Sequence, residues 1–486
     1  MVTTLRIARA EFLQFRRSGV LVLVGLVLTA LIATSAVVAW RAERAYEAER
    51  RRYAGDVAAH WAAQPDRHPH RVAHYGYLLF RPRSPLAFFD AGVTAQTGSA
   101  LFLEAHRQNS LNFAEASQAD APIRFGALTM ALVLQLLVPL VLLLAAAGSV
   151  ARERDEGTLA MIRAQGVSWP AILGGKTLAL TAMAVALAAP AALVAGVLLG
   201  RAGTAQWTAD AWQRLAALAG VHVLYFAACA GAGVVISALS RTRRDATLTL
   251  VGTWLVLWVV VPRVVPVAGD VARPLPTRAQ FEAEVERRVR ALGDSHDPTD
   301  ENFAAFRAQT LASHGVQRVE DLPVNYNGVV MIEGERLSSE AYQDFRGVLD
   351  AIVADHARVA AAAGWVSPYV AMRLASMTLA GADPSAVLHF ERAAEDYRYR
   401  LVQHLNQLHT EVVRLEDDRY AATVGATEAP TRKRIAATHW DEAPVFAYDP
   451  PALSTSAAAG WTPFAALTVW TGGLLLVAGR LRPRTF

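Results

Sequence analysis

The residues of this sequence whose type and spacing could do chemistry are histidines gathered between positions 68 and 106. The candidate metal ligands are His68, His70, His74 and His106. His70 and His74 would share one face of a helix, as imidazole ligands of Zn²⁺ require. Pro69 interrupts that stretch, however, and the nearest acids, Asp66 and Glu104, have no fixed geometry. We therefore predict no metal site and assign these histidines to polar packing and turns; a metal site at His70, His74 and His106 is the alternative.

No other set of residues indicates catalysis. The sequence contains no HExxH motif and no nucleophile elbow, so a hydrolase is not expected. Gly174-Gly175-Lys176-Thr177 imitates the end of a phosphate-binding loop, but Pro170 occupies the position of the earlier glycine. We therefore predict that the chain is not an enzyme and binds no nucleotide or other cofactor. If ATP is used, it is used by a separate subunit.

The elements that must position any site are membrane helices. Hydrophobic residues make up 53% of the 486 residues and charged residues 19%, which is typical of a membrane protein. A helix that crosses a bilayer needs about 20 mostly apolar residues. Six segments qualify, and they predict an all-α membrane protein: 20–40, 126–150, 174–200, 215–239, 246–268 and 460–479.

Positive charge orients the six spans. Basic residues are concentrated in 1–19, 151–173, the turn before 246, and the tail 480–486, so both termini are predicted to be cytoplasmic. These residues are Arg6, Arg9, Arg16, Arg17, Arg152, Arg154, Arg163, Lys176, Arg241, Arg243, Arg244, Arg480, Arg482 and Arg484. The net charge of +4 therefore indicates topology and not binding to nucleic acid. The expected location is the bacterial inner membrane.

Two large segments, 41–125 and 269–459, then lie outside the cytoplasm as mainly helical insertions. A stripe of apolar residues at helical spacing predicts one long helix: Val387, Phe390, Ala394, Tyr397, Leu401, Leu405, Leu408, Val412 and Leu415. Residues 340–363 predict a second long helix, and the two helices should pack as a hairpin. The apolar run from Trp365 to Ala380 is expected along the membrane surface.

The spans contain few ionisable residues. His222 and Arg263 lie toward the outer ends of their helices, and Lys176 lies at an inner boundary. Pumps driven by ion gradients usually carry ionisable groups near the middle of the membrane. The sequence therefore disfavours that class of transporter, and any transport must draw its energy from elsewhere.

The loop between the second and third spans, 151–173, is the most informative stretch. A charged helix end is followed by a break at Gly157, a short amphipathic helix from Thr158, and a second break at Gly166. Such a helix across the inner face of the membrane is a suitable lever for a soluble partner. An ordinary solvated connector explains the composition as well.

The order of residues in this loop resembles the ABC-2-type permeases of ATP-driven transporters. Glu153 and Glu156 precede Gly157-Thr158-Leu159, and a Gly-Val-Ser turn leads to Gly175-Lys176 at the next span. The resemblance implies that this loop is a coupling helix that docks on a partner ATPase. The implied contact residues are Glu153, Asp155, Glu156, Gly157, Thr158, Leu159, Ile162 and Arg163.

Residues 1–19 are similar to the amphipathic elbow helix of the same permeases. Leu5, Ala8, Phe12 and Phe15 form an apolar face, and basic residues lie elsewhere on the helix. The implied interfacial residues are Arg6, Arg9, Phe12 and Arg16. Trp169-Pro170 departs mildly from the family pattern, which affects only the local geometry of the loop.

The outer segments resemble a branch of these permeases with large periplasmic insertions and a C-terminal domain of unknown function. The resemblance lies in residues 70–90, 103–109 and 367–406. It implies two permease subunits, identical or paralogous, and two ATPase subunits that hold ATP and magnesium. The expected function is export of an unidentified substrate. The alternative is a membrane-anchored scaffold that transmits ATP-driven motion to a periplasmic partner without conducting substrate.

Overall fold

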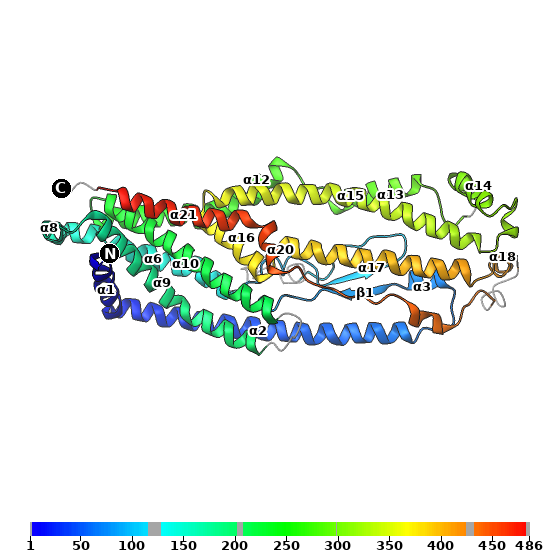
Figure 1. The fold of residues 1–486 in the computed structure, drawn as a ribbon, viewed down its shortest axis with the longest axis horizontal. Helices are drawn as coiled ribbons and strands as arrows, with labels where there is room; N and C mark the ends of the chain where they lie inside the picture. The colour runs from blue at the N-terminus through cyan, green and yellow to red at the C-terminus, as the bar shows by residue number, and fades with distance from the viewer. Residues whose placement is uncertain (1, 115–127, 202–207, 298, 424–431, 483–486) are drawn as a thin grey trace.

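The computed structural model describes residues 2–114, 128–201, 208–297, 299–423 and 432–482, which form one elongated bundle of helices (Figure 1). Residues 126, 127 and Arg484 of the predicted elements lie outside the described residues. Helix α8 (Thr158–Ala164) and both chain ends lie at one extreme of the bundle. Helices α14 (Ala304–Ser313) and α18 (Leu415–Thr423) lie at the other.

Among the residues that the structure describes, six helices are long and apolar enough to cross a membrane, which confirms the predicted number of spans and the all-α class. The first is α2 (Gly19–Ala62), and the second is built from α5 (Met130–Leu132), η2 (Val133–Leu137), α6 (Val138–Ala147) and α7 (Ala151–Asp155). The others are α9 (Trp169–Gly200); α10 (Thr208–Leu239); α11 (Arg243–Trp254), η4 (Leu255–Val260) and α12 (Val261–Ala272); and α21 (Trp461–Arg480).

Helix α2 continues well beyond the first predicted span. The residues after position 40 alternate alanine with charged residues, and no proline occurs before Pro65. Glu47 pairs with Arg50 and Arg51 at distances of 2.7 Å, at helical spacings that stabilise an exposed helix. The first span is therefore the base of a 44-residue rod that reaches the far half of the molecule.

Two spans contain a π-helical segment, and in each a proline follows two residues later. Pro139 follows η2 and Pro262 follows η4; neither can donate a backbone hydrogen bond. Each proline therefore leaves a carbonyl in the preceding turn without its helical partner. The Gln135 carbonyl accepts hydrogen bonds from the Tyr225 hydroxyl at 2.7 Å and the Trp258 indole N–H at 3.2 Å. The spans are thus joined where their helices are interrupted.

The far half of the molecule contains a small sheet and further helices. In the 41–125 segment, α3 (Pro69–Tyr75) leads to strand β1 (Tyr77–Phe80), which pairs antiparallel with β2 (Ala100–Leu103), Tyr77 opposite Leu103. The 269–459 segment contains α13 (Arg278–Ala291), η5 (Glu301–Phe303), α14, η6 (Val319–Asp321), α15 (Tyr326–Gly364), α16 (Pro368–Ala380), α17 (Pro384–Glu411), α18, η7 (Ala437–Glu442) and α20 (Leu453–Ala459).

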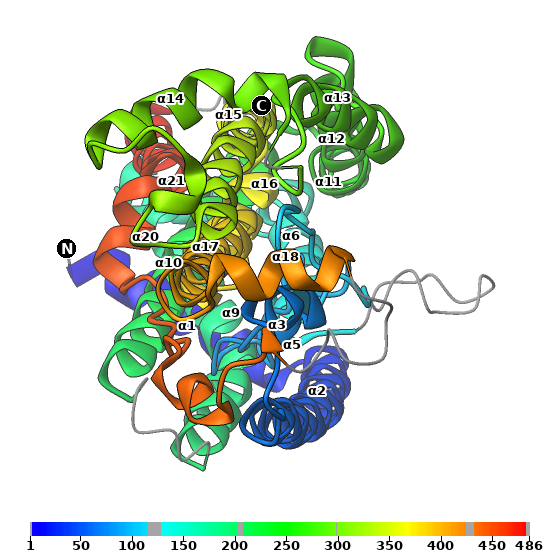
Figure 2. The same ribbon diagram turned by 90° about the vertical axis from the view of Figure 1, so that its right-hand side faces the viewer.

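The predicted pair of long helices is confirmed. Helix α17 buries the predicted stripe from Val387 to Leu408 and packs against the 39-residue helix α15. Viewed along the bundle, α17 lies between α15 and α3 (Figure 2). The stripe ends earlier than predicted, because α17 stops at Glu411 and Val412 is exposed. Helices α3 and α17 and both strands form one hydrophobic core, which Trp440 closes. This core joins the 41–125 segment to the 269–459 segment.

The expectation that the run from Trp365 to Ala380 lies along the membrane surface is wrong for α16, although Trp365 and Val366 before it are exposed. Helix α16 packs against α10, α15 and α21, and Ala371, Ala375 and Ser376 are fully buried. The Ser367 hydroxyl donates to the Leu257 carbonyl at 2.6 Å, in the turn that Pro262 interrupts. The α15–α16 turn therefore re-enters the bundle alongside the middle of the fifth span. The small side chains of α16 allow this close packing.

Candidate functional site

The predicted coupling loop forms the tip of the bundle beyond the spans. Gly157 has a φ of 74° and separates α7 from α8, a conformation that favours glycine. Gly166, with a φ of 76°, ends the turn after α8, and the Ser168 hydroxyl then caps α9. The two breaks that the sequence predicts are therefore present, and they set α8 apart as a short separate helix.

Helix α7 is fixed to the turn between α10 and α11. The Arg154 guanidinium donates to the Ala238 carbonyl at 2.7 Å and to the Ser240 carbonyl, so it caps the end of α10. The Asp155 carboxylate accepts from the Arg243 backbone N–H at 2.9 Å. These bonds tie α7 to the end of α10 and the start of α11.

A buried charge cluster connects the loop with the N-terminal helix α1 (Val2–Arg17). The Lys176 ammonium, which is only 1% exposed, contacts the Glu153 carboxylate at 2.7 Å and also the Glu11 carboxylate. Lys176 belongs to α9, Glu153 to α7 and Glu11 to α1. The lysine of the Gly174-Gly175-Lys176-Thr177 sequence therefore forms ion pairs with two carboxylates and links three helices.

Helix α1 packs closely on α9. A Cβ atom at Gly175 would lie 2.8 Å from the Ile7 Cβ atom and from the Thr4 carbonyl oxygen, so only glycine fits there. Of the predicted interfacial residues, Phe12 is half-buried. The basic ones, Arg6, Arg9 and Arg16, are exposed. Leu5, predicted on the apolar face, is 53% exposed and does not take part in this packing.

The predicted contact residues of the loop divide into two groups. Asp155, Glu156, Gly157 and Thr158 are exposed at the tip. Glu153 and Leu159 point inward, Ile162 packs against the core of the spans, and Arg163 lies over the Trp169 ring at 5.3 Å. The inward group therefore holds the loop in place, and the exposed group is available to a partner.

Met161 is an exposed residue of α8 that the sequence analysis missed. Its side chain is 65% exposed, on the side of α8 opposite the buried Leu159. Met161 lies two positions after Leu159, which is a rotation of about 200° around the helix and places the two side chains on opposite sides. An apolar side chain projecting from a tip is a suitable anchor in a groove of another protein.

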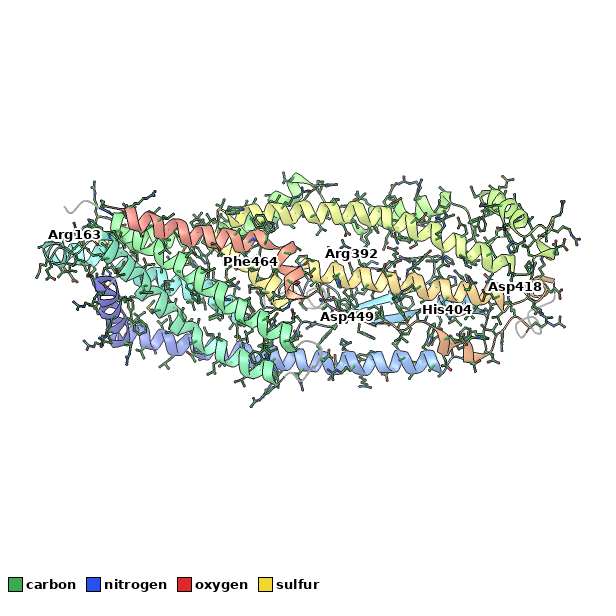
Figure 3. All side chains as sticks on the ribbon, in the orientation of Figure 1. Arg163, Arg392, His404, Asp418, Asp449 and Phe464 are labelled. Carbon is green, nitrogen blue, oxygen red and sulfur yellow. The ribbon has the colours of Figure 1, made fainter. Side chains whose placement is uncertain are left out.

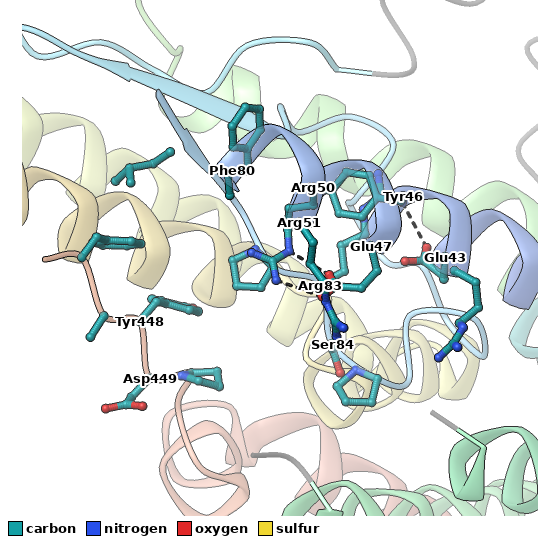
Figure 4. A pocket seen from close by; sticks show the side chains of 18 of the residues that line it. Glu43, Tyr46, Glu47, Arg50, Arg51, Phe80, Arg83, Ser84, Tyr448 and Asp449 are labelled. Carbon is teal, nitrogen blue, oxygen red and sulfur yellow. Dashed lines mark hydrogen bonds and ion pairs between the residues drawn. The ribbon is translucent and has the colours of Figure 1, made fainter. Parts of the chain in front are cut away.

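Large cavities lie beyond the spans, and three of them are bordered by described residues of the far half. Figure 4 shows one of about 580 Å³ between α2 and residues 445–450. Several of its charged side chains are paired with one another: Arg83 with Glu43 at 3.1 Å, and Glu47 with two arginines of α2. The other two have volumes of about 460 and 740 Å³ and border His74 and His106 respectively.

The predicted metal-ligand candidates fall into two groups near the far end. His70 and His74 of α3 meet His106, which follows β2, and His296, which follows α13. Burial, and then the neighbouring imidazoles, lowers the pKa of His70 to about 2. His296 was not a candidate in the sequence analysis, because 190 residues separate it from His106 and no spacing rule connects them.

His68 belongs to the second group, with His409 and Asp418. The Asp418 carboxylate accepts from His409 at 2.7 Å, from His68 at 3.2 Å and from the Asn325 amide at 2.7 Å. Burial alone would raise the pKa of Asp418, but the hydrogen bonds from His409 and His68 hold it well below its ordinary value. This group lies near α18, at the opposite end from Arg163 of the loop (Figure 3).

Comparison with known proteins gives two matches. A family model described as ABC-2 family transporter protein matches residues 5–336. A model described as Domain of unknown function (DUF3526) matches residues 278–449. No curated protein matches the chain. The first match covers α1, the loop and every span except α21, and the second covers the long helices α15 and α17.

Proposed function

The chain belongs to the ABC-2 family of transporter proteins, and from this premise we propose that it is a permease subunit that exports an unidentified substrate with energy from a separate ATPase. The family match and the exposed loop at the tip of the spans are the observations that carry the proposal. The permease itself holds no ATP or magnesium in this proposal; both belong to the ATPase.

The ATPase docks on the exposed face of α8. Glu156, Thr158 and Met161 belong to this docking face, because they are exposed polar and apolar side chains of the tip. An apolar anchor beside a carboxylate suits a groove that is apolar at its centre and basic at its rim. The buried Lys176 cluster and the Arg154 cap support a role in transmission, since they tie the docking face to four helices.

The end of the bundle that carries α8 faces the cytoplasm. Exposed arginines gather there, on α1, beside α11 and at the end of α21, as the positive-inside rule requires. The segments 41–125 and 269–459 then project into the periplasm of a bacterium. A second permease subunit, identical or paralogous, completes the transporter and contributes the other wall of the path.

The experiment compares two charge reversals. Glu156→Lys should prevent an ATPase from co-purifying with the detergent-solubilised protein from its native membrane and should abolish permease-dependent ATP hydrolysis. Glu416→Lys, the same change at an exposed position of the distant helix α18, should do neither. Mass spectrometry of the co-purified proteins and ATPase assays in nanodiscs give the two measurements.

Two outcomes would overturn the docking proposal. One is the absence of any ATPase beside the folded wild-type protein. The other is equal retention of the ATPase by Glu156→Lys and Glu416→Lys. Thermal melting of both variants establishes that they are folded.

A further inference from the structure

We propose that His70, His74, His106 and His296 bind one zinc-type divalent cation that fastens the 41–125 segment to the 269–459 segment. His70 and His74 belong to α3, His106 lies in the turn directly after β2, and His296 lies in the turn after α13. The four residues therefore converge from three separate parts of the chain.

The four rings already have the spacing of a tetrahedral site. Their candidate ligand nitrogens all lie within 4.8 Å of one another, and the Nε2 atoms of His70 and His74 are 3.1 Å apart. All six distances between ring centres fall between 4.5 and 5.9 Å. Four imidazoles on zinc, with Zn–N near 2.1 Å, would have ring centres about 5.2 Å apart. Small side-chain movements complete the site.

Carboxylates orient two of the rings. The Nδ1 atom of His106 lies 3.1 Å from the Glu335 carboxylate, and the Nδ1 atom of His296 lies 3.0 Å from the Asp294 carboxylate. Protonation at Nδ1 leaves the Nε2 lone pair of each ring for a metal, which is how ligand histidines are commonly held. The Nε2 atom of His106 is buried and has no hydrogen-bond partner among the described residues.

The backbone around His106 and His296 is arranged for this approach. His106 has a φ of 61°, a left-handed conformation that costs free energy for a residue with a side chain. Glu335 holds it there by also accepting from the His106 backbone N–H at 2.9 Å, while Arg398 binds the other carboxylate oxygen at 2.6 Å. On α15, Gly334 leaves room for Ser295, because a Cβ atom there would lie 2.3 Å from the Ser295 Cβ atom.

The ligand set selects the class of metal. Four imidazoles suit zinc and its late-transition neighbours, whereas calcium and magnesium require oxygen ligands. No thiol takes part, so the site is compatible with an oxidising compartment. Pro69, which argued against a metal site in the sequence, is the first residue of α3, where proline is favoured, and it leaves His70 and His74 on one helical face.

The test uses the full-length protein in detergent, purified without a histidine tag and stripped with EDTA. Zinc is added, excess metal is removed by gel filtration, and bound zinc and the melting temperature are measured. Wild type should retain one zinc per chain and melt at a higher temperature than its stripped form. His74→Ala and His296→Ala, both at exposed positions, should weaken zinc binding at least about 10-fold and remove the thermal shift.

His60→Ala is the matched control, because His60 is an exposed histidine of α2 outside the group. It should bind zinc as wild type does. Cobalt in place of zinc should give the intense visible absorption of a tetrahedral complex. Equal zinc binding by wild type and the His74→Ala/His296→Ala double variant would overturn the proposal, as would an octahedral cobalt spectrum. Melting of the stripped variants at the wild-type temperature shows that they fold.

Discussion

Replacing Lys176 by methionine is expected to loosen α1 and the docking loop from the bundle. Lys176 is buried and is the shared cation of Glu11 and Glu153. Methionine has a similar length but no charge, so the two carboxylates would face each other without a cation. The free energy of unfolding should therefore fall, although little volume is lost.

The size of the effect follows from burial. Removing one partner of a buried ion pair costs about 3–5 kcal/mol, because the remaining charge stays desolvated. The side chains of Glu11 and Glu153 retain 10% and 14% exposure, so water relieves part of the repulsion. We therefore expect a loss of about 3 kcal/mol. Neutralising both carboxylates in the triple variant Glu11→Gln/Glu153→Gln/Lys176→Met should restore most of it.

The assay is equilibrium unfolding by SDS in mixed micelles, followed by tryptophan fluorescence. Arg9→Met, at an exposed position of α1, controls for loss of one positive charge. The reasoning is refuted if Lys176→Met unfolds at the same SDS fraction as Arg9→Met. It is also refuted if the triple variant is no more stable than Lys176→Met alone, because the cost would then not arise from unpaired carboxylates.

Three further predictions concern packing, hydrogen bonding and pH. Gly175→Ala should destabilise the protein by about 1–3 kcal/mol in the same assay, whereas Gly174→Ala, whose Cβ atom would have a 3.6 Å contact, should be neutral or slightly stabilising. Ser367→Ala should cost about 1–3 kcal/mol and speed hydrogen exchange in the α15–α16 turn, because the Leu257 carbonyl loses its partner and α16 loses its N-cap. Ser385→Ala, at an exposed position, should do neither. The pKa of Asp418 is lowered by folding, so its stabilisation is present above its unfolded pKa of about 3.9 and is lost as pH falls below that value. Exchange in α18, corrected for intrinsic rates, should rise from pH 5 to pH 3, and Asp418→Asn should remove that dependence.

The sequence predicts the spans and the long helices well, because both depend on local patterns. Runs of about 20 apolar residues have few alternatives to crossing a membrane. The apolar residues from Val387 to Leu408 recur every three or four positions, which is the period of a helix. The limits of α8 also follow from a local property. Gly157 and Gly166 have positive φ angles, which glycine adopts without strain, and so they mark the breaks on either side of α8.

Other features depend on contacts between distant residues. Helix α16 is apolar on most sides, and such a segment fits a membrane surface or a helical core equally well until its neighbours are known. His296 stands among acidic residues in a turn, and only the placement of that turn on α15 brings it to His106. The exposed position of Met161 could have been predicted, because it follows from counting along α8.

The packing of the α15–α16 turn against the middle of the fifth span has a consequence for synthesis in the cell. The first five spans are complete once Ala272 has been synthesised. Helices α16 and α21 complete the packing around α10, but they are made only over roughly the next 200 residues. At about 5–20 residues per second, the Leu257 carbonyl waits about 5–20 s for Ser367. During that time the partly made bundle has an open side, and membrane chaperones or a partner subunit would have their best access to it.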